Sequence, residues 1–226
     1  MSEKKYRIYV RAVSPVHLSS GKADISLDAE IVHDDTGLPL FPAKRLRGLL
    51  YESAIEVVEM GELSGQAILD RQLVEDLFHH PGNSGTRLIM HDLALQGEDG
   101  SSYEQMHREW AWLQRRYPGL LTPADVLETY SSIRYQTEID KETGTAAEHS
   151  LHNMRVLDEG QVFTGTLTLV LAEGREDFRP YEELLAVAMA NLRTAGMKRN
   201  RGFGVLECSM EGQSGLLEAA LAGEVK

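Results

Sequence analysis

The sequence predicts an α+β fold made of two strand–helix–strand units, and three observations support this prediction. Residues 6–13 alternate apolar and polar side chains, which is the period of a strand with one buried face. From Ala43 the apolar spacing becomes that of a helix. A second alternating strand, Phe163 to Leu171, precedes an amphipathic helix at about residues 180–195. Together these elements give the split βαβ order of a ferredoxin-like core.

The first predicted strand leads into its helix through a loop and a turn. Ser14-Pro15 ends or bends the strand, and Pro42 suits the first turn of the helix, where a missing N–H costs nothing. The other elements expected in this half are a short extended run at 29–33, a turn at 34–37, a helix at about 66–78 and a strand at 87–95.

Two insertions separate the two units. Residues 97–128 begin as a polar, irregular stretch and become helical around Trp110, which predicts a helical insertion. Residues 131–158 carry a turn at 143–145 and are expected to form a long hairpin, or arm. A last strand at about 205–210 precedes a peripheral tail. We expect one domain, residues 1–226, with a ferredoxin-like or RNA-recognition-type core at about 5–58, 87–95 and 160–211.

The composition is that of an ordinary globular protein, with 42% hydrophobic residues in 226. No apolar run approaches the roughly 18 residues of a membrane-spanning helix. Met1 to Lys5 lead into a strand pattern without the apolar segment of a secretion signal, so a cytoplasmic protein with no membrane partner is expected. Cys208 is the sole cysteine, which excludes an internal disulfide and predicts a small apolar role for this residue.

Positive charge is concentrated in two short segments of an acidic chain. The net charge of −12 argues by itself against a nucleic-acid partner. However, residues 38–51 and 193–205 together hold seven of the 23 lysines and arginines and none of the 35 acidic residues. This distribution would focus a polyanion onto one site and repel it elsewhere. The alternative is chance clustering on solvent-exposed faces.

The second cationic segment contains Gly196 to Gly204, with three glycines, three cations and one aromatic residue in nine positions. Glycine permits positive φ and the close approach of another polymer, and lysine and arginine supply charge and donors for phosphate. The pattern predicts a phosphate-binding loop between a helix and a strand. The alternative is a helix C-cap followed by a β-bulge whose cations only face solvent.

The loop after the first strand holds the residues that could carry chemistry. It contains His17, Asp24 and Asp28. Carboxylates in such a loop can act as a general base, hold a divalent cation or only tune the local field. The chain has no G-x-x-x-x-G-K-[ST], H-E-x-x-H or G-x-S-x-G motif. The residues alone therefore leave these three roles open.

Four motifs occur in a fixed order along nearly the whole chain. They are Ser14 to Gly21; Asp28 to Val32, leading through Thr36 to Pro42 into the helix Ala43 to Leu50; Leu77-Phe78 with Arg87 to Asp92; and Gly196 to Gly204, ending Arg201-Gly202-Phe203-Gly204. As a set they resemble the RAMP superfamily of CRISPR effector subunits, and most closely the repeated backbone subunit of type III (Csm- and Cmr-like) complexes.

The resemblance implies an RNA-recognition-type core with an inserted thumb, which is the 131–158 arm. A guide RNA would lie along the helix from Ala43 and the glycine-rich loop, and copies would stack head to tail beside other CRISPR effector subunits. The thumb would enter between guide and target RNA through Arg134, Ile139, Met154 and Arg155. The implied RNA-binding residues are Lys44, Arg45, Arg47, Lys198, Arg199, Asn200, Arg201, Gly202 and Phe203.

The resemblance also implies a cleaving aspartate in the loop after the first strand. Asp28 matches it when one gap is allowed before Thr36, Asp24 is the alternative, and His17 matches a family histidine. The expected activity is cleavage of target RNA by its own 2′-hydroxyl, with Asp28 holding Mg²⁺ or Mn²⁺. The other hypotheses are a structural RNA-binding subunit without chemistry, and a metal-independent guide-processing endonuclease that uses His17 as its base.

Overall fold

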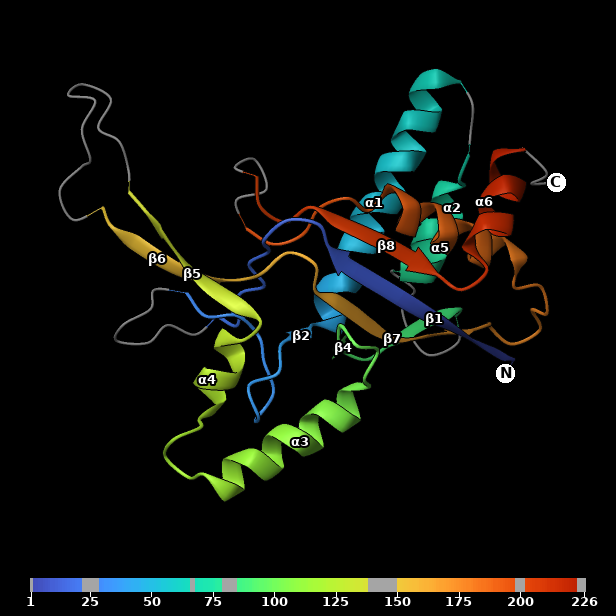
Figure 1. The fold of residues 1–226 in the computed structure, drawn as a ribbon. Helices are drawn as coiled ribbons and strands as arrows, with labels where there is room; N and C mark the ends of the chain where they lie inside the picture. The colour runs from blue at the N-terminus through green and yellow to red at the C-terminus, as the bar shows by residue number, and fades with distance from the viewer. Residues whose placement is uncertain are drawn as a thin grey trace, which may run out of the picture.

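The computed structural model describes residues 2–21, 29–65, 68–78, 85–137, 150–197 and 202–222. Its main element is an antiparallel sheet with the strand order β2-β4-β7-β1-β8, in which β3 also pairs with β7 (Figure 1). The strands are β1 (Glu3–Ala12), β2 (Leu40–Phe41), β3 (Arg87–Met90), β4 (Leu93–Gln96), β7 (Val162–Val170) and β8 (Leu206–Met210). With β3 and β4 at one edge, this is the ferredoxin-like order that the sequence predicts.

Strand β1 lies inside the sheet, between β7 and β8, because its alternating side chains bury one face. Tyr6, Ile8 and Val10 are at most 7% exposed and belong to the hydrophobic core. Arg7 and Arg11 point to the opposite face and are exposed. The prediction of a strand with one buried face is therefore confirmed.

The strand predicted at 87–95 is two strands, β3 and β4, separated by a β-bulge. The pairing with β7 shifts by one position between them, so three residues of this edge oppose two of β7. The Oδ1 atom of Asp92, in the bulge, accepts a hydrogen bond from the N–H of Ala43 at 2.8 Å. Asp92 thereby caps helix α1 (Ala43–Ser64), which lies earlier in the chain and whose own N-cap residue, Pro42, makes no side-chain cap. The sequence signal is a shift of the buried leucines from even to odd positions.

Three helices cover one face of the sheet: α1 (Ala43–Ser64), α2 (Arg71–Phe78) and α5 (Arg179–Asn191) (Figure 1). Helix α5 stops short of its predicted end at 195 because Leu192 adopts an extended backbone. The predicted peripheral tail is wrong, since it contains helix α6 (Gln213–Leu221). This helix packs on α5 and buries Ala220, which is 3% exposed.

The two segments expected to be insertions both contain regular secondary structure. The first contains α3 (Tyr103–Arg116) and α4 (Pro123–Glu128). The second is a hairpin of β5 (Ser131–Gln136) and β6 (His152–Leu157), which lies to one side of the main sheet (Figure 1). Its predicted turn at 143–145 lies outside the described residues.

The extended run predicted at 29–33 is not a strand. It makes only isolated bridges, in which Ala29 pairs with Met154, Ile31 with Ser19 and His33 with Pro39. Because its partners come from three separate segments, no continuous ladder forms. The run instead connects the loop after β1 to the hairpin, and this connection positions the site described below.

Two expectations from the composition concern the core and the membrane. Burial raises the pKa of the Cys208 thiol to about 12, which agrees with the small apolar role predicted for it. Among the helices of the described ranges, none has both the length and the apolar content that crossing a bilayer requires.

Candidate nucleic-acid interface

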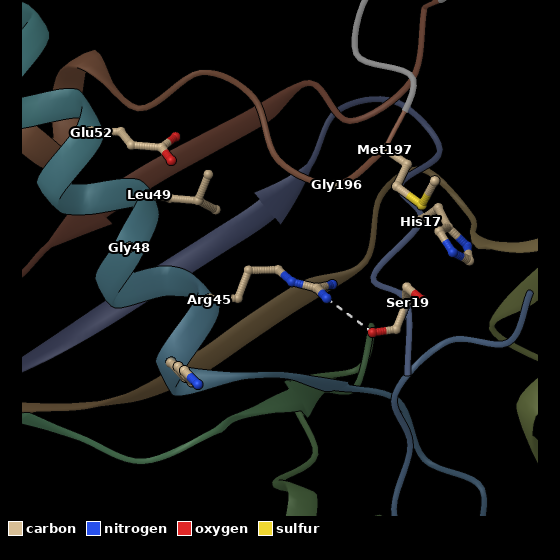
Figure 2. Close-up of a pocket in the computed structure, with 9 residues that line it drawn as sticks. His17, Ser19, Arg45, Gly48, Leu49, Glu52, Gly196 and Met197 are labelled. Carbon is tan, nitrogen blue, oxygen red and sulfur yellow. Dashed lines mark hydrogen bonds between the residues drawn. The ribbon is translucent and has the colours of Figure 1, made fainter. Parts of the chain in front are cut away.

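A pocket of about 300 Å³ lies where three segments far apart in the sequence come together. These segments are the loop after β1, the first turns of α1 and the start of the glycine-rich loop (Figure 2). Its lining residues are His17, Ser19, Lys44, Arg45, Gly48, Leu49, Glu52, Gly196 and Met197. The two cationic segments of the sequence therefore meet at one site.

Helix α1 presents one face to this pocket. Lys44, Gly48 and Glu52 are four residues apart, so they stack along the same side of the helix. Gly48 is exposed, and a Cβ atom built there would meet no atom within 4 Å. This side thus combines a cation near the N-terminus of the helix with open space one turn later, where a polymer backbone can lie against it.

Arg45 is held in place inside the pocket. Its Nη2 atom donates a hydrogen bond to the carbonyl oxygen of Ser19 at 2.9 Å (Figure 2). Burial lowers the pKa of the Arg45 guanidinium, although an arginine stays charged at neutral pH. The remaining N–H groups of this fixed cation are suited to bind phosphate, since a guanidinium carries five donors.

Arg47 does not line the pocket, although the resemblance implied an RNA contact for it. Its Nη1 and Nη2 atoms donate to the carbonyl oxygens of Leu88 and Phe78 at 2.7 and 2.9 Å. Its guanidinium also lies over the Phe78 ring, 5.9 Å from the centroid. Arg47 thus fastens the end of α2 and strand β3 to helix α1, and the RNA contact expected of it stays a prediction.

His17 is the most buried polar residue of the pocket. Its side chain is 0% exposed, and its Nδ1 atom lies 2.6 Å from the carbonyl oxygen of Arg155 on the hairpin. Gly196 packs against the His17 backbone so closely that a Cβ atom there would lie 2.5 Å from the His17 carbonyl oxygen. His17 therefore connects the loop after β1, the hairpin and the glycine-rich loop.

Two of the expected thumb residues lie buried at the base of the hairpin. Met154 and Arg155 are 5% and 6% exposed. The Nε atom of Arg155 forms an ion pair with Glu30 at 3.1 Å, and its Nη1 atom donates to the hydroxyl of Ser131 at 3.3 Å. These contacts attach the hairpin to the core, so the side chains of Met154 and Arg155 are not available to enter a duplex.

The hairpin carries an exposed aromatic residue for which the sequence pattern predicted no binding role. Tyr135 is 64% exposed and follows Arg134, which is also exposed. Its signal was an aromatic residue beside a cation in a polar strand, a combination that suits stacking on bases. Ile139, the remaining thumb residue, lies outside the described residues.

Both ends of the glycine-rich loop are held by backbone contacts. The N–H of Gly204 donates to the carbonyl oxygen of Pro15, and its carbonyl oxygen accepts from the N–H of Ala195, both at 2.8 Å. Gly202 is exposed and Phe203 is half-buried, while Lys198, Arg199, Asn200 and Arg201 lie outside the described residues. The predicted loop thus begins at the pocket and ends against Pro15, in the loop after β1.

Gly204→Ala is expected to destabilise the protein by about 3 kcal/mol, measured by chemical denaturation. Its φ is +80°, and a Cβ atom would lie 2.0 Å from the Ala195 carbonyl oxygen. Gly202→Ala is the matched control, because Gly202 has the same φ but open space around the added methyl group. The control should lose only about 1 kcal/mol. Equal losses for the two variants would show that the contact with Ala195 does not matter.

Asp24 and Asp28 lie outside the described residues, but the segments on either side of them are placed. The N–H of Ser20 donates to the carbonyl oxygen of Glu30 at 2.8 Å, and the N–H of Arg155 donates to that of Ala29 at 3.1 Å. The segment that carries both aspartates therefore starts and ends beside the pocket and the base of the hairpin.

In the described part of the chain, Asp34, Asp35 and His107 form one group with the residue types of a metal site. The Asp34 carboxylate is already occupied. One oxygen accepts from the N–H and the hydroxyl of Thr36, and the other accepts from the Tyr103 hydroxyl at 2.6 Å. We interpret the group as a contact that attaches α3 to the turn at 34–37.

Comparison with known proteins gives one family match. A family model described as the RAMP superfamily matches residues 9–207 of this chain. A search of curated protein sequences finds no match.

The solved structures that contain similar chains include two cryo-EM structures. One is the Type III-B Cmr-beta bound to cognate target RNA, with 10% identity and a TM-score of 0.61 over 95% of this chain and 99% of that chain. The other is the apo state of Type III-B Cmr-beta, with 11% identity and a TM-score of 0.62 over 92% and 97%. At this identity the likeness shows a shared fold, and it confirms the predicted fold class.

Proposed function

Because the chain belongs to the RAMP superfamily, we propose that it binds guide RNA as a backbone subunit of a type III CRISPR effector complex. The observation that carries the proposal is the meeting of two cationic segments at one pocket of an otherwise acidic chain. The similar chains come from Type III-B Cmr-beta structures, one of them with cognate target RNA bound. The proposed partners are guide RNA, target RNA, further copies of this chain and other effector subunits.

The pocket is suited to grip a strand by its backbone. Lys44 and Arg45 supply two cations, and the Arg45 side chain is already ordered by Ser19, so less entropy is lost on binding. Glu52 lines the pocket two turns further along α1 and repels phosphate there. None of these groups selects a base sequence, so target choice is left to base pairing with the guide.

The hairpin is suited to act as the thumb through Arg134 and Tyr135 rather than through Met154 and Arg155. The exposed pair can stack on bases and contact phosphate. The buried pair, with the Glu30 ion pair, fixes the angle at which the hairpin leaves the core. A thumb held in this way can separate guide from target at one nucleotide.

We also propose that Asp28 supports cleavage of the target RNA at this displaced nucleotide. Among the described residues nearby, Glu30 is engaged by Arg155 and by the N–H of Ile31, so its carboxylate is not free for a cation. Asp28, with Asp24 as the alternative, therefore supplies the oxygen donors, a set that fits Mg²⁺ or Mn²⁺. Such a cation would offset charge on the phosphate while the 2′-hydroxyl attacks.

Lys44→Ala is expected to weaken the binding of a single-stranded guide RNA about fivefold and to lower the salt slope by about one unit. Fluorescence anisotropy at several KCl concentrations measures both quantities. Lys5→Ala is the matched control, because Lys5 is exposed on β1 outside the pocket and carries the same charge. An unchanged slope for the Lys44 variant, or an equal change for both variants, would place the RNA elsewhere.

A further inference from the structure

We propose that the Nε2 atom of His17 accepts a hydrogen bond from a ribose 2′-hydroxyl of the bound guide strand, so that His17 selects RNA over DNA. This inference rests on the proposed function, because it assumes that a nucleic-acid strand occupies the pocket. The evidence for the inference is the buried imidazole of His17, whose two nitrogen atoms have different surroundings.

The first nitrogen determines which ring tautomer is present. Nδ1 lies 2.6 Å from the carbonyl oxygen of Arg155, and a carbonyl oxygen can only accept a hydrogen bond. Nδ1 must therefore carry the proton and donate it. In the neutral ring the other nitrogen, Nε2, then has a lone pair and acts as an acceptor.

The second nitrogen lacks a protein partner. His17 is 0% exposed, and its Nε2 atom is buried without a hydrogen bond from the described part of the chain. Most buried polar atoms in native proteins have a partner, and leaving one unpaired is costly. Because His17 lines the pocket, a bound molecule can supply the missing donor.

The chemistry of the pocket indicates which group that donor is. Lys44 and Arg45 attract phosphate, but phosphate oxygens at neutral pH are acceptors and cannot pair with a lone pair. The 2′-hydroxyl is the donor that every ribonucleotide carries close to its phosphates, and deoxyribonucleotides lack it. Base amino groups are also donors, but they differ from base to base, whereas a guide of any sequence has the sugar.

Two residues of the glycine-rich loop line the pocket together with His17. Gly196 packs on the His17 backbone. Met197 lies beside His17 in Figure 2 and is 53% exposed. Since methionine is unbranched and flexible, its side chain can move aside when a sugar enters.

The test uses two substitutions, each of which replaces the function of one ring nitrogen of His17 and removes that of the other. In His17→Asn the amide nitrogen takes the place of Nδ1 and can donate to the Arg155 carbonyl, but no acceptor remains at Nε2. In His17→Gln an amide oxygen reaches the position of Nε2. The full-length chain and both variants are titrated with each ligand at about pH 8. The ligands are one all-ribose oligonucleotide and a series in which a single 2′-deoxy position moves along the strand.

For the unchanged protein we expect one deoxy position to weaken binding about fivefold to tenfold, the effect of one lost hydrogen bond. His17→Asn should bind the all-ribose strand weaker by the same factor and show no further loss at that position, whereas His17→Gln should keep the discrimination. Thermal unfolding of both variants confirms that they fold.

Two results would overturn the inference. If His17→Asn discriminates against the deoxy position as strongly as the unchanged protein, then Nε2 pairs with water or with a base. If no single deoxy position matters to the unchanged protein, no 2′-hydroxyl is recognised here. Failure of the unchanged protein to bind the all-ribose strand is a distinct result, because it overturns the proposed function and this inference with it.

Discussion

Asp28→Asn is expected to reduce target-RNA cleavage by the assembled complex at least a hundredfold, while guide and target binding stay unchanged. The substitution keeps the size of the side chain but removes its charge and basicity. A positioned acid–base group or metal ligand contributes on the order of 10² to 10⁴ to a rate. Binding should persist because the contacts proposed to hold the strand come from Lys44, Arg45 and the glycine-rich loop, which line the pocket. Single-turnover cleavage of a labelled target and filter binding measure the two properties.

Asp24→Asn is the matched control, since it changes the same residue type in the same segment. If the Asp24 variant loses cleavage and the Asp28 variant retains it, the assignment moves to Asp24. If neither variant nor EDTA affects the reaction, or the unchanged complex does not cleave, then the chain is a structural RNA-binding subunit. A guide-processing enzyme with His17 as base would instead cut repeat RNA in EDTA without partners.

Arg155→Met is expected to destabilise the protein by about 3 kcal/mol, because it leaves the Glu30 carboxylate without its cation at a largely buried site. Methionine keeps much of the apolar stem, so the loss reports mainly on the charge and on the hydrogen bond to Ser131. Chemical denaturation measures the change in the free energy of unfolding. Arg155 holds the base of the hairpin. Relative to the unchanged protein, the variant should therefore lose more affinity for target RNA than for guide RNA alone.

Arg134→Met is the matched control, because Arg134 lies on the paired strand of the same hairpin and is exposed. It should change stability by less than about 0.5 kcal/mol. The double variant Glu30→Gln with Arg155→Met should recover part of the loss, since no unpaired charge remains. A loss of similar size in the Arg134 variant, or no recovery in the double variant, would contradict the role given to the ion pair.

Local patterns predicted most of the fold. Strands β1 and β7 alternate apolar and polar residues, and the apolar residues from Ala43 have helical spacing, so each element has one apolar face. Elements of this kind bury their apolar faces against each other. The hairpin at 131–158 was also predictable from two extended runs around a turn. The bulge between β3 and β4 was missed because it shifts the pairing by a single residue. The role of α6 was missed because its nine residues are too few to show a clear apolar period.

The sequence indicated which residue types form the candidate site, but not which individual residues line it. Two acid-free cationic segments on a chain of net charge −12 are enough to indicate a polyanion site from residue types alone. The same pattern gives no reason to distinguish Arg45 from Arg47. In the structure, Arg45 donates to Ser19 in the pocket. Arg47 instead donates to the carbonyl oxygens of Leu88 and Phe78. Side chains two positions apart on a helix point in different directions, and what each one meets comes from segments distant in the chain.

The sequence by itself determined the element order, the acidic body and the two segments that carry positive charge, since these depend on residue type and spacing alone. Only the tertiary structure decided that the segments meet, that Arg155 is a buried anchor and that the Nε2 atom of His17 has no donor among the described residues. The physical reason is that hydrogen bonds and ion pairs depend on distance in space. That distance is set when the sheet brings the loop after β1, the first turns of α1 and the glycine-rich loop to one place.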